Sequence, residues 1–234
     1  MSSTLALIGV RGLGRDIALH FAREGWRVLC GARTRSAVEE LARAVDEAGG
    51  TGVPVVCDIT QATSLARFAA EPVDLVVAAQ TSGVRFGSLP LLDIPDDELR
   101  QGFSSYVQGT WNLLKAFGPG LLERGHGTFL QMGTSSGIRT REGFAALGAV
   151  QHGLRALVQV AAREWRPRGI HVAYVPIDGP IASAAARKHG RPADRLLTPA
   201  AIARACAYLH AQTPDAWTHE LVLRPAGGEW TAPT

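Results

Sequence analysis

The chain has 234 residues, of which 46% are hydrophobic and 19% are charged, the balance of an ordinary globular protein. Its formal net charge is +3 and its arginines are scattered, so neither nucleic acid nor a membrane surface is expected as a partner. No apolar run approaches the roughly 18 residues of a membrane-spanning helix, and the first residues lack the features of a signal peptide. These features favour a cytoplasmic location.

The chain has three cysteines, Cys30, Cys57 and Cys206, which are widely spaced and odd in number. Such a set provides neither a disulfide framework nor the ligand spacing of a metal site. Cys30 and Cys57 fall inside expected strands, where cysteine commonly serves as a small buried hydrophobic residue. We therefore expect a protein of a reducing compartment that holds no metal.

Short apolar runs alternate with amphipathic segments along the whole chain. Pro95 and the three acids after it mark the start of one long helix, because proline and acidic residues favour the first helical turn. In chain order we expect a strand at Thr4–Gly9, a helix at Gly12–Glu24, a strand at Trp26–Gly31, a helix at Ser36–Ala48, a strand at Val53–Cys57, a short helix at Leu65–Ala69, a strand at Val73–Ala79, a helix from Pro95 to about Phe117, a strand at Thr128–Met132, a helix at Gly143–Trp165, a strand at Ile170–Val175, a helix near Pro199–His210 and a strand near His219–Leu223.

Strands that alternate with helices require right-handed crossovers, and these give a parallel sheet covered by helices on both faces. No repeat, low-complexity tract or linker interrupts the pattern. We therefore predict one α/β domain over residues 1–234.

The first expected strand ends in GVRGLG, which contains Gly9, Gly12 and Gly14. A strand, a glycine-rich turn and a helix form a phosphate-binding site, because glycines let the backbone approach a pyrophosphate and the helix N-terminus supplies free N–H groups. A tight strand-to-helix turn without a ligand is the alternative interpretation.

Two residues at the ends of the next strands favour a nucleotide. Arg33 follows the second strand, where an acid would bind a ribose 2′-hydroxyl and an arginine suits a 2′-phosphate instead. Asp58 follows the third strand and is placed to meet an adenine edge, or to cap a helix. Together they favour NADP(H) over NAD(H).

At this point the chain resembles the short-chain dehydrogenase/reductase family over nearly its whole length. The matching pieces are the GVRGLG turn, Asp58-Ile-Thr, the PLLDIPDDELRQGFSSYVQGTWNLLKAF helix and AREWRPRGIHV, which is similar to the family's A-x-E-x-x-P-x-G-I-x-V. The resemblance implies a doubly wound Rossmann-type fold with a seven-stranded, mostly parallel sheet and a site at the C-terminal ends of its strands. It also implies a homodimer or homotetramer formed through the two long helices, with apolar contacts from Leu154, Leu157, Val158 and Trp111.

The chain departs from the family pattern in its cofactor-binding half. Only Val10 and Arg11 separate Gly9 from Gly12, so the turn is one residue shorter than in the family, and Arg11 is placed to compensate by pairing with phosphate. The family's Asn-Asn-Ala-Gly stretch corresponds to Ala78–Thr81. Tyr106 replaces an asparagine that lies three residues before a glycine in the following helix.

The catalytic tetrad is also altered. The family's lysine corresponds to Gln151, its tyrosine to Leu147 and its serine to Thr134. No tyrosine of the chain has a lysine four residues further on, so the Tyr-x-x-x-Lys pair is absent. The chain therefore resembles an atypical branch of the family, in which Gln151 can hydrogen-bond ribose hydroxyls but supplies no charge.

Three hypotheses of function follow. The favoured one is a non-redox reaction of a small molecule in a biosynthetic pathway, such as cyclisation, elimination, isomerisation or hydrolysis. Tyr106 would be its acid–base group, Thr134 would bind the substrate oxygen and Asp178 would be a base. Tyr106 has a second interpretation as a core aromatic residue, and Asp178 as a turn residue before Gly179.

The second hypothesis is an NADP(H)-dependent oxidoreductase in which Tyr106 or a water donates the proton and Thr134 assists. The third is a catalytically silent partner protein that binds a nucleotide. The loop after the fifth strand carries Arg139 and Arg141, which would grip an anionic substrate or simply be solvated. The segment Ile181–Leu197 lies where substrates are usually covered in this family.

Overall fold

The computed structural model describes residues 2–81, 83, 86–183 and 192–228. The residues 184–191 of the expected substrate-covering segment lie outside this described part. The described strands form one six-stranded parallel sheet in the order β3-β2-β1-β4-β5-β6. Its strands are β1 (Thr4–Ile8), β2 (Arg27–Ala32), β3 (Thr51–Val56), β4 (Leu75–Ala78), β5 (Gly127–Thr134) and β6 (Ile170–Ile177).

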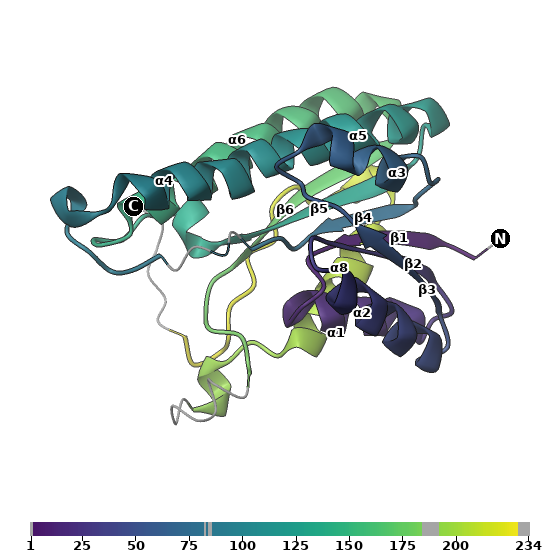
Figure 1. Ribbon diagram of the computed structural model, residues 1–234, viewed down its shortest axis with the longest axis horizontal. Coiled ribbons are helices and arrows are strands. Elements are labelled where there is room, and N and C mark those ends of the chain that lie inside the picture. The colour runs from purple at the N-terminus through teal and green to yellow at the C-terminus, as the bar shows by residue number, and fades with distance from the viewer. Residues whose placement is uncertain (1, 82, 84–85, 184–191, 229–234) are drawn as a thin grey trace.

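Helices cover both faces of the sheet, as the alternating pattern predicts. Figure 1 shows α4, α5 and α6 in a layer above the sheet and α1, α2 and α8 in a layer below it. The bounds are α1 (Leu13–Ala22), α2 (Arg35–Glu47), α3 (Ala66–Ala69), α4 (Asp96–Gly102), α5 (Gly109–Arg124), α6 (Ala145–Trp165) and α8 (Pro199–His210). Among the described helices, none is both long and apolar enough to cross a membrane.

Two hydrophobic cores lie on opposite faces of the sheet. One contains Phe21 of α1, Val38 of α2 and Ile202 of α8, and the other contains Phe117 of α5 and Leu154 of α6. The five strands other than β3 contribute side chains to both cores, because successive side chains of a strand point to opposite faces. The carboxyl ends of the parallel strands therefore meet at one edge of a rigid sheet.

The described part of the chain has six strands, so the expectation of a seventh strand at His219–Leu223 is wrong. This segment does run beside β6, where Tyr174 bridges Glu220 and Ile177 bridges Leu223. Between the two bridges β6 contains Val175 and Pro176, and Pro176 has no N–H to donate and so leaves a gap in the ladder. The segment is therefore held by two separate bridges and not by a continuous strand.

The expected helix from Pro95 to Phe117 is longer and less regular than predicted. Between α4 and α5 the chain forms a π-helix at Phe103–Gln108, a conformation that is frequent at functional sites. The helix then continues through Pro119 and ends at Gly125, whose φ of 70° is the left-handed conformation that glycine adopts most easily.

The apolar contacts expected between subunits are partly wrong. Leu154 is 0% exposed and Val158 is 1% exposed, because both pack into the core under α6. Leu157 packs partly against the same core. Trp111, in contrast, is 48% exposed on α5.

Candidate functional site

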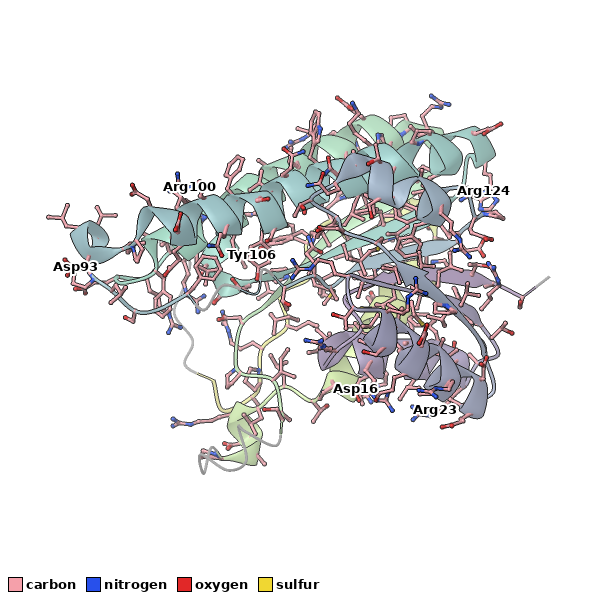
Figure 2. All side chains as sticks on the ribbon, viewed as in Figure 1. Asp16, Arg23, Asp93, Arg100, Tyr106 and Arg124 are labelled. Atoms are coloured by element: carbon pink, nitrogen blue, oxygen red, sulfur yellow. The ribbon has the colours of Figure 1, made fainter. Side chains whose placement is uncertain are left out.

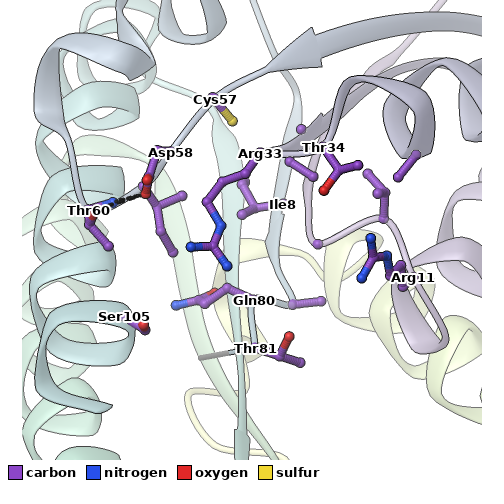
Figure 3. A pocket seen from close by; sticks show the side chains of 17 residues that line it. Ile8, Arg11, Arg33, Thr34, Cys57, Asp58, Thr60, Gln80, Thr81 and Ser105 are labelled. Atoms are coloured by element: carbon purple, nitrogen blue, oxygen red, sulfur yellow. Dashed lines mark hydrogen bonds between the residues drawn. The ribbon is translucent and has the colours of Figure 1, made fainter. Parts of the chain in front are cut away.

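A cleft opens at the carboxyl ends of β1, β2, β3 and β4, where Rossmann-type folds bind ligands. Its volume is about 830 Å³, including the solvent-open space at its mouth. Figure 3 shows the polar side chains that line it. The lining residues are Ile8, Gly9, Val10, Arg11, Gly31, Ala32, Arg33, Thr34, Ala37, Cys57, Asp58, Ile59, Thr60, Ala79, Gln80, Thr81 and Ser105.

The glycine turn is packed so tightly that side chains are excluded from it. A Cβ on Gly9 would lie 2.4 Å from the carbonyl oxygen of Ala79, and a Cβ on Gly14 would lie 1.6 Å from the carbonyl oxygen of Gly9. Gly12, with a φ of 50°, is the N-cap of α1 and has no side chain to cap its first N–H groups. The turn therefore delivers the N-terminus of a ten-residue helix to the rim of the cleft.

Arginine side chains supply positive charge to this cleft. Arg11 and Arg33 are both exposed and both line it, together with the hydroxyl of Thr34. Arg33 reaches toward the loop after β4, where its Nη2 atom is 3.9 Å from the position of a Cβ on Gly83. The lining residues at the end of β2 are Gly31, Ala32, Arg33 and Thr34, and none of them is acidic.

Asp58 lies in the cleft wall and stabilises a turn. Its Oδ1 accepts hydrogen bonds from the backbone nitrogen of Thr60 at 3.0 Å and from the Thr60 hydroxyl at 2.8 Å, as Figure 3 shows. Its own N–H donates to Ser64 Oγ at 2.8 Å. Asp58 therefore fixes the loop after β3 beside the cleft, and its contact with an adenine edge stays a prediction.

The residue at the family's lysine position is directed into the protein. Gln151 is 0% exposed, and its Oε1 accepts hydrogen bonds from the backbone nitrogen of Thr134 at 3.1 Å and from the hydroxyl of Tyr174 at 3.4 Å. The Tyr174 hydroxyl also lies 3.3 Å from the carbonyl oxygen of Thr134. In this arrangement Gln151 holds the end of β5, which argues against its expected role as a ribose ligand.

Two buried polar atoms lie unpaired at this end of β5. Neither Thr134 Oγ1 nor Gln151 Nε2 has a hydrogen-bond partner among the described residues. An unpaired buried polar group costs free energy unless a ligand or water satisfies it. The buried hydroxyl of Thr134 thus lacks a partner within the described part of the chain, and its role toward a substrate stays a prediction.

Tyr106 lies in the π-helix and is half-buried. Figure 2 shows it on the side of the helix that faces the sheet. Its ring packs against Phe86, with 6.2 Å between the ring centroids, and it also contacts the core under α5 and α6. These contacts agree with the interpretation of Tyr106 as a packing residue. Its role as a proton donor stays a prediction.

Asp178 is clamped between two arginines at the end of β6. Arg139 Nη2 lies 3.0 Å from both carboxylate oxygens, and Arg224 Nε lies 2.6 Å from Oδ2. Burial alone would raise the pKa of Asp178, but the hydrogen bonds from Arg224 and Arg139 outweigh it and hold the pKa below its ordinary value. A carboxylate so stabilised is a poor base, which argues against the base role expected for Asp178.

Several residues that build the site were not predicted from the sequence. Arg139 was expected to grip a substrate or to be solvated, yet its side chain is 11% exposed and bound to Asp178. Gln80 and Thr34 line the cleft, and their position directly after a strand is the signal that could have found them. The three cysteines are free and buried as expected, and burial raises the pKa of Cys57, at the cleft wall, to about 11.

Comparison with known proteins defines the family. The family model described as Enoyl-(Acyl carrier protein) reductase matches residues 8–220. The chain therefore belongs to the short-chain dehydrogenase/reductase family, as its motifs indicate. Among the described residues, no group of three or more histidine, cysteine or acidic side chains could hold a metal ion.

Three similar proteins illustrate the relationship. Glycine betaine reductase ATRR from Emericella nidulans is 26% identical over 229 residues, which are 92% of this chain and 18% of that protein. A metagenomic short-chain oxidoreductase in complex with NADP is 25% identical, with a TM-score of 0.80 over 95% of this chain and 96% of that chain. An alcohol dehydrogenase from the archaeon Thermococcus sibiricus, complexed with 5-hydroxy-NADP, is 24% identical, with a TM-score of 0.84 over 99% of this chain and 100% of that chain, and it shows the shared fold.

The chain spans between 18% and 65% of the length of the first four curated relatives that it matches. The first two proteins described above are named as a reductase and an oxidoreductase. They do not support the non-redox reaction that the sequence analysis favoured, and they fit its oxidoreductase alternative better. That expectation was based on the absence of the family's tyrosine and lysine. The family match nevertheless extends over residues 8–220.

Proposed function

We propose that this chain is an NADP(H)-dependent oxidoreductase that acts on a small-molecule substrate with a noncanonical proton donor. The observation that carries the proposal is that Arg11 and Arg33 both line the cleft, whereas none of the lining residues at the end of β2 is acidic. An acid at this place would bind a free 2′-hydroxyl and repel a phosphate, whereas arginine binds phosphate by charge-assisted hydrogen bonds.

The residues fit such a cofactor. A Cβ at Gly9 or Gly14 would clash with neighbouring backbone, so both positions of the turn that leads into α1 require glycine. Arg33 and Thr34 would hold the 2′-phosphate, and Arg11 would lie beside the phosphates at the start of α1. The shortened turn is therefore compatible with a dinucleotide because Arg11 adds a charged donor.

When bound, the nicotinamide supplies or accepts the hydride. Thr134 would donate a hydrogen bond from its unpaired hydroxyl to the substrate oxygen. Leu147 offers no proton at the family's tyrosine position, so Tyr106 or a water would deliver the proton. General acid catalysis is worth about 10²–10⁴-fold in rate. A substrate that needs little acid assistance, such as an activated enone or an iminium, would suit this site.

Calorimetric titration with NADPH and NADH tests the cofactor assignment. We expect NADPH to bind more tightly than NADH, and Arg33→Ala to weaken NADPH binding by about tenfold or more while changing NADH binding little. Arg35→Ala is the matched control, because Arg35 is 77% exposed on α2 and pairs with Glu39. If neither dinucleotide binds, hydride transfer is excluded and the proposed function fails.

Oxidation of NADPH in the presence of enones and cyclic iminium ions tests the proton donor. Thr134→Val removes the hydroxyl at nearly constant volume and should lower kcat by about 10²-fold. Tyr106→Phe should lower kcat by about 10²-fold if the phenol donates the proton. An unchanged kcat in Tyr106→Phe assigns the proton to water.

A further inference from the structure

Three polar side chains form a closed ring of hydrogen bonds beneath the cleft. Gln80 Nε2 donates to Thr110 Oγ1 at 3.1 Å, and Thr110 Oγ1 donates to Gln131 Oε1 at 3.1 Å. Gln131 Nε2 closes the ring by donating to Gln80 Oε1 at 3.2 Å. Each member both donates and accepts, so the ring joins the loop after β4 to α5 and to the middle of β5.

The ring fixes the position of Gln80. Thr110 and Gln131 are each 0% exposed, and Gln131 Nε2 is also directed at the carbonyl oxygens of Ala78 and Met132, at 3.1 and 2.9 Å. Buried polar groups with satisfied hydrogen bonds hold a single arrangement, because breaking it would leave them unpaired. Gln80 is the half-buried member of the ring and the one that lines the cleft.

Gln80 retains hydrogen-bonding capacity on its cleft side. A primary amide has two N–H donors and two acceptor lone pairs, and the ring uses one N–H group and one lone pair of Gln80. The remaining donor and acceptor match a hydroxyl group, which can accept and donate at once. In the family stretch that corresponds to Ala78–Thr81, this position is an alanine, which has no such groups.

The neighbouring Arg33 indicates which hydroxyl group of the cofactor Gln80 would bind. Figure 3 shows the Arg33 side chain pointing across the cleft toward Gln80, and Arg33 also reaches Gly83, three residues beyond Gln80. On the adenosine ribose of NADP(H), the 2′-phosphate and the 3′-hydroxyl are on adjacent carbons. We infer that Gln80, held by Thr110 and Gln131, binds the 3′-hydroxyl of the adenosine ribose whose 2′-phosphate pairs with Arg33. This inference rests on the proposed function.

The experiment compares two ligands in two proteins by calorimetry. The ligands are adenosine 2′,5′-bisphosphate and the same compound without its 3′-hydroxyl, and neither carries a nicotinamide. In the wild-type protein we expect loss of the hydroxyl to weaken binding by about fivefold to tenfold. In Gln80→Leu the two ligands should differ by less than about twofold, because the partner of the hydroxyl is gone.

Two further variants sharpen the result. Thr110→Val breaks the ring but leaves the Gln80 side chain itself unchanged. In this variant, removal of the ligand's 3′-hydroxyl should weaken binding by less than about threefold. Gln159→Leu is the control, since Gln159 lies on α6 and donates to Glu220 outside the cleft. If Gln80→Leu does not fold, as thermal melting would reveal, Thr110→Val and the wild-type comparison decide.

The outcomes separate the inference from the proposed function. If wild-type protein binds neither NADPH nor the bisphosphate, the proposed function fails. If it binds both and the 3′-hydroxyl contributes nothing, or contributes equally in wild type and Gln80→Leu, the proposed function stands and the role of Gln80 is overturned.

Discussion

The Oε1 atom of Gln151 lies 3.1 Å from the backbone nitrogen of Thr134 and accepts its hydrogen bond. These two residues occupy the positions of the family's lysine and serine. In this chain they bind each other, so that α6 holds the end of β5 directly. The lysine position has thus become part of the support of the site, and Thr134 remains as its polar group.

Replacing Gln151 should therefore lower stability. Gln151→Leu leaves the N–H of Thr134 without its acceptor in a buried place, and we expect a loss of about 1–3 kcal/mol in the free energy of unfolding. Gln101→Leu, on the exposed side of α4, should change it by less than about 0.5 kcal/mol. Urea unfolding of the three proteins measures the difference, and equal values for both variants would contradict the supporting role.

Breaking the ion pairs of Asp178 with Arg139 and Arg224 should cost more stability than replacing Gln151. Asp178→Asn leaves Arg139 and Arg224, whose side chains are only 11% and 14% exposed, without their carboxylate, and we expect it to lose about 3–5 kcal/mol of stability. Asp97→Asn breaks an ion pair with Arg100 whose side chains are 75% and 72% exposed, so it should cost less than about 1 kcal/mol. Chemical denaturation compares the two variants, and similar losses would show that the clamp adds nothing.

Two histidines, the buried His171 and the half-buried His210, should make stability depend on pH. Burial is the main cause that lowers the pKa of His171 and of His210 below the ordinary value of 6.5. The unfolded chain therefore takes up protons before the folded one does. This stability is fully present above pH 6.5 and is lost as the pH falls through the lowered values.

Urea unfolding between about pH 7.5 and pH 5.5 measures this effect, with an expected loss of about 1–2 kcal/mol. His171→Gln should reduce the pH dependence, whereas His126→Gln, at an exposed position, should not. A stability that is constant over this range, or that rises on acidification, would contradict the prediction.

The alternation of strands and helices could be predicted because buried parallel strands are short apolar runs and their covering helices are amphipathic. The edge strand β3 could also be placed, although it contains Pro54, because an edge strand tolerates a residue without an N–H. The gap in the ladder at Pro176 could have been predicted from the sequence only with the knowledge that β6 extends to Ile177 and has a neighbour on its outer side.

The side-chain geometry of the site could not be predicted in the same way. Spacing along α6 puts Leu147 and Gln151 on one face, but it does not show that Gln151 turns toward Tyr174. Nor does the sequence show that Arg139 and Arg224, 39 and 46 residues from Asp178, converge on it. Such contacts depend on how distant loops pack, and no local pattern encodes them.

The glycine turn offers a test of the cleft itself. Gly14→Ala would place a methyl group 1.6 Å from the carbonyl oxygen of Gly9, so the turn must shift, and we expect a loss of about 3 kcal/mol or more together with loss of nucleotide binding. Gly12→Ala meets nothing within 4 Å and carries only the strain of its φ of 50° and ψ of −118°, about 1–3 kcal/mol. Thermal melting with and without NADPH distinguishes the two, and equal effects would contradict the packing argument.

The exposed apolar side chains on α5 and the preceding π-helix bear on assembly. Trp111 is 48% exposed and Phe103 is 53% exposed, and burial of such side chains is the usual driving force for association. We expect a homodimer or a homotetramer, with a mass by light scattering of two or four times 24.8 kDa. Trp111→Lys should shift it toward the monomer, and a wild-type monomer would contradict the prediction.

The buried phenol of Tyr174 bears on whether the family's tyrosine and lysine could be introduced into this chain. Its hydroxyl lies 2.3 Å from the position of a Cβ on Gly133 and 2.2 Å from that of a Cβ on Gly137, and it also contacts Gln151. A lysine at position 151 would meet this filled and buried space, where an ammonium group is costly. Two substitutions on α6 would therefore not by themselves build a Tyr-x-x-x-Lys centre, because the phenol of Tyr174 from β6 occupies the space beside position 151.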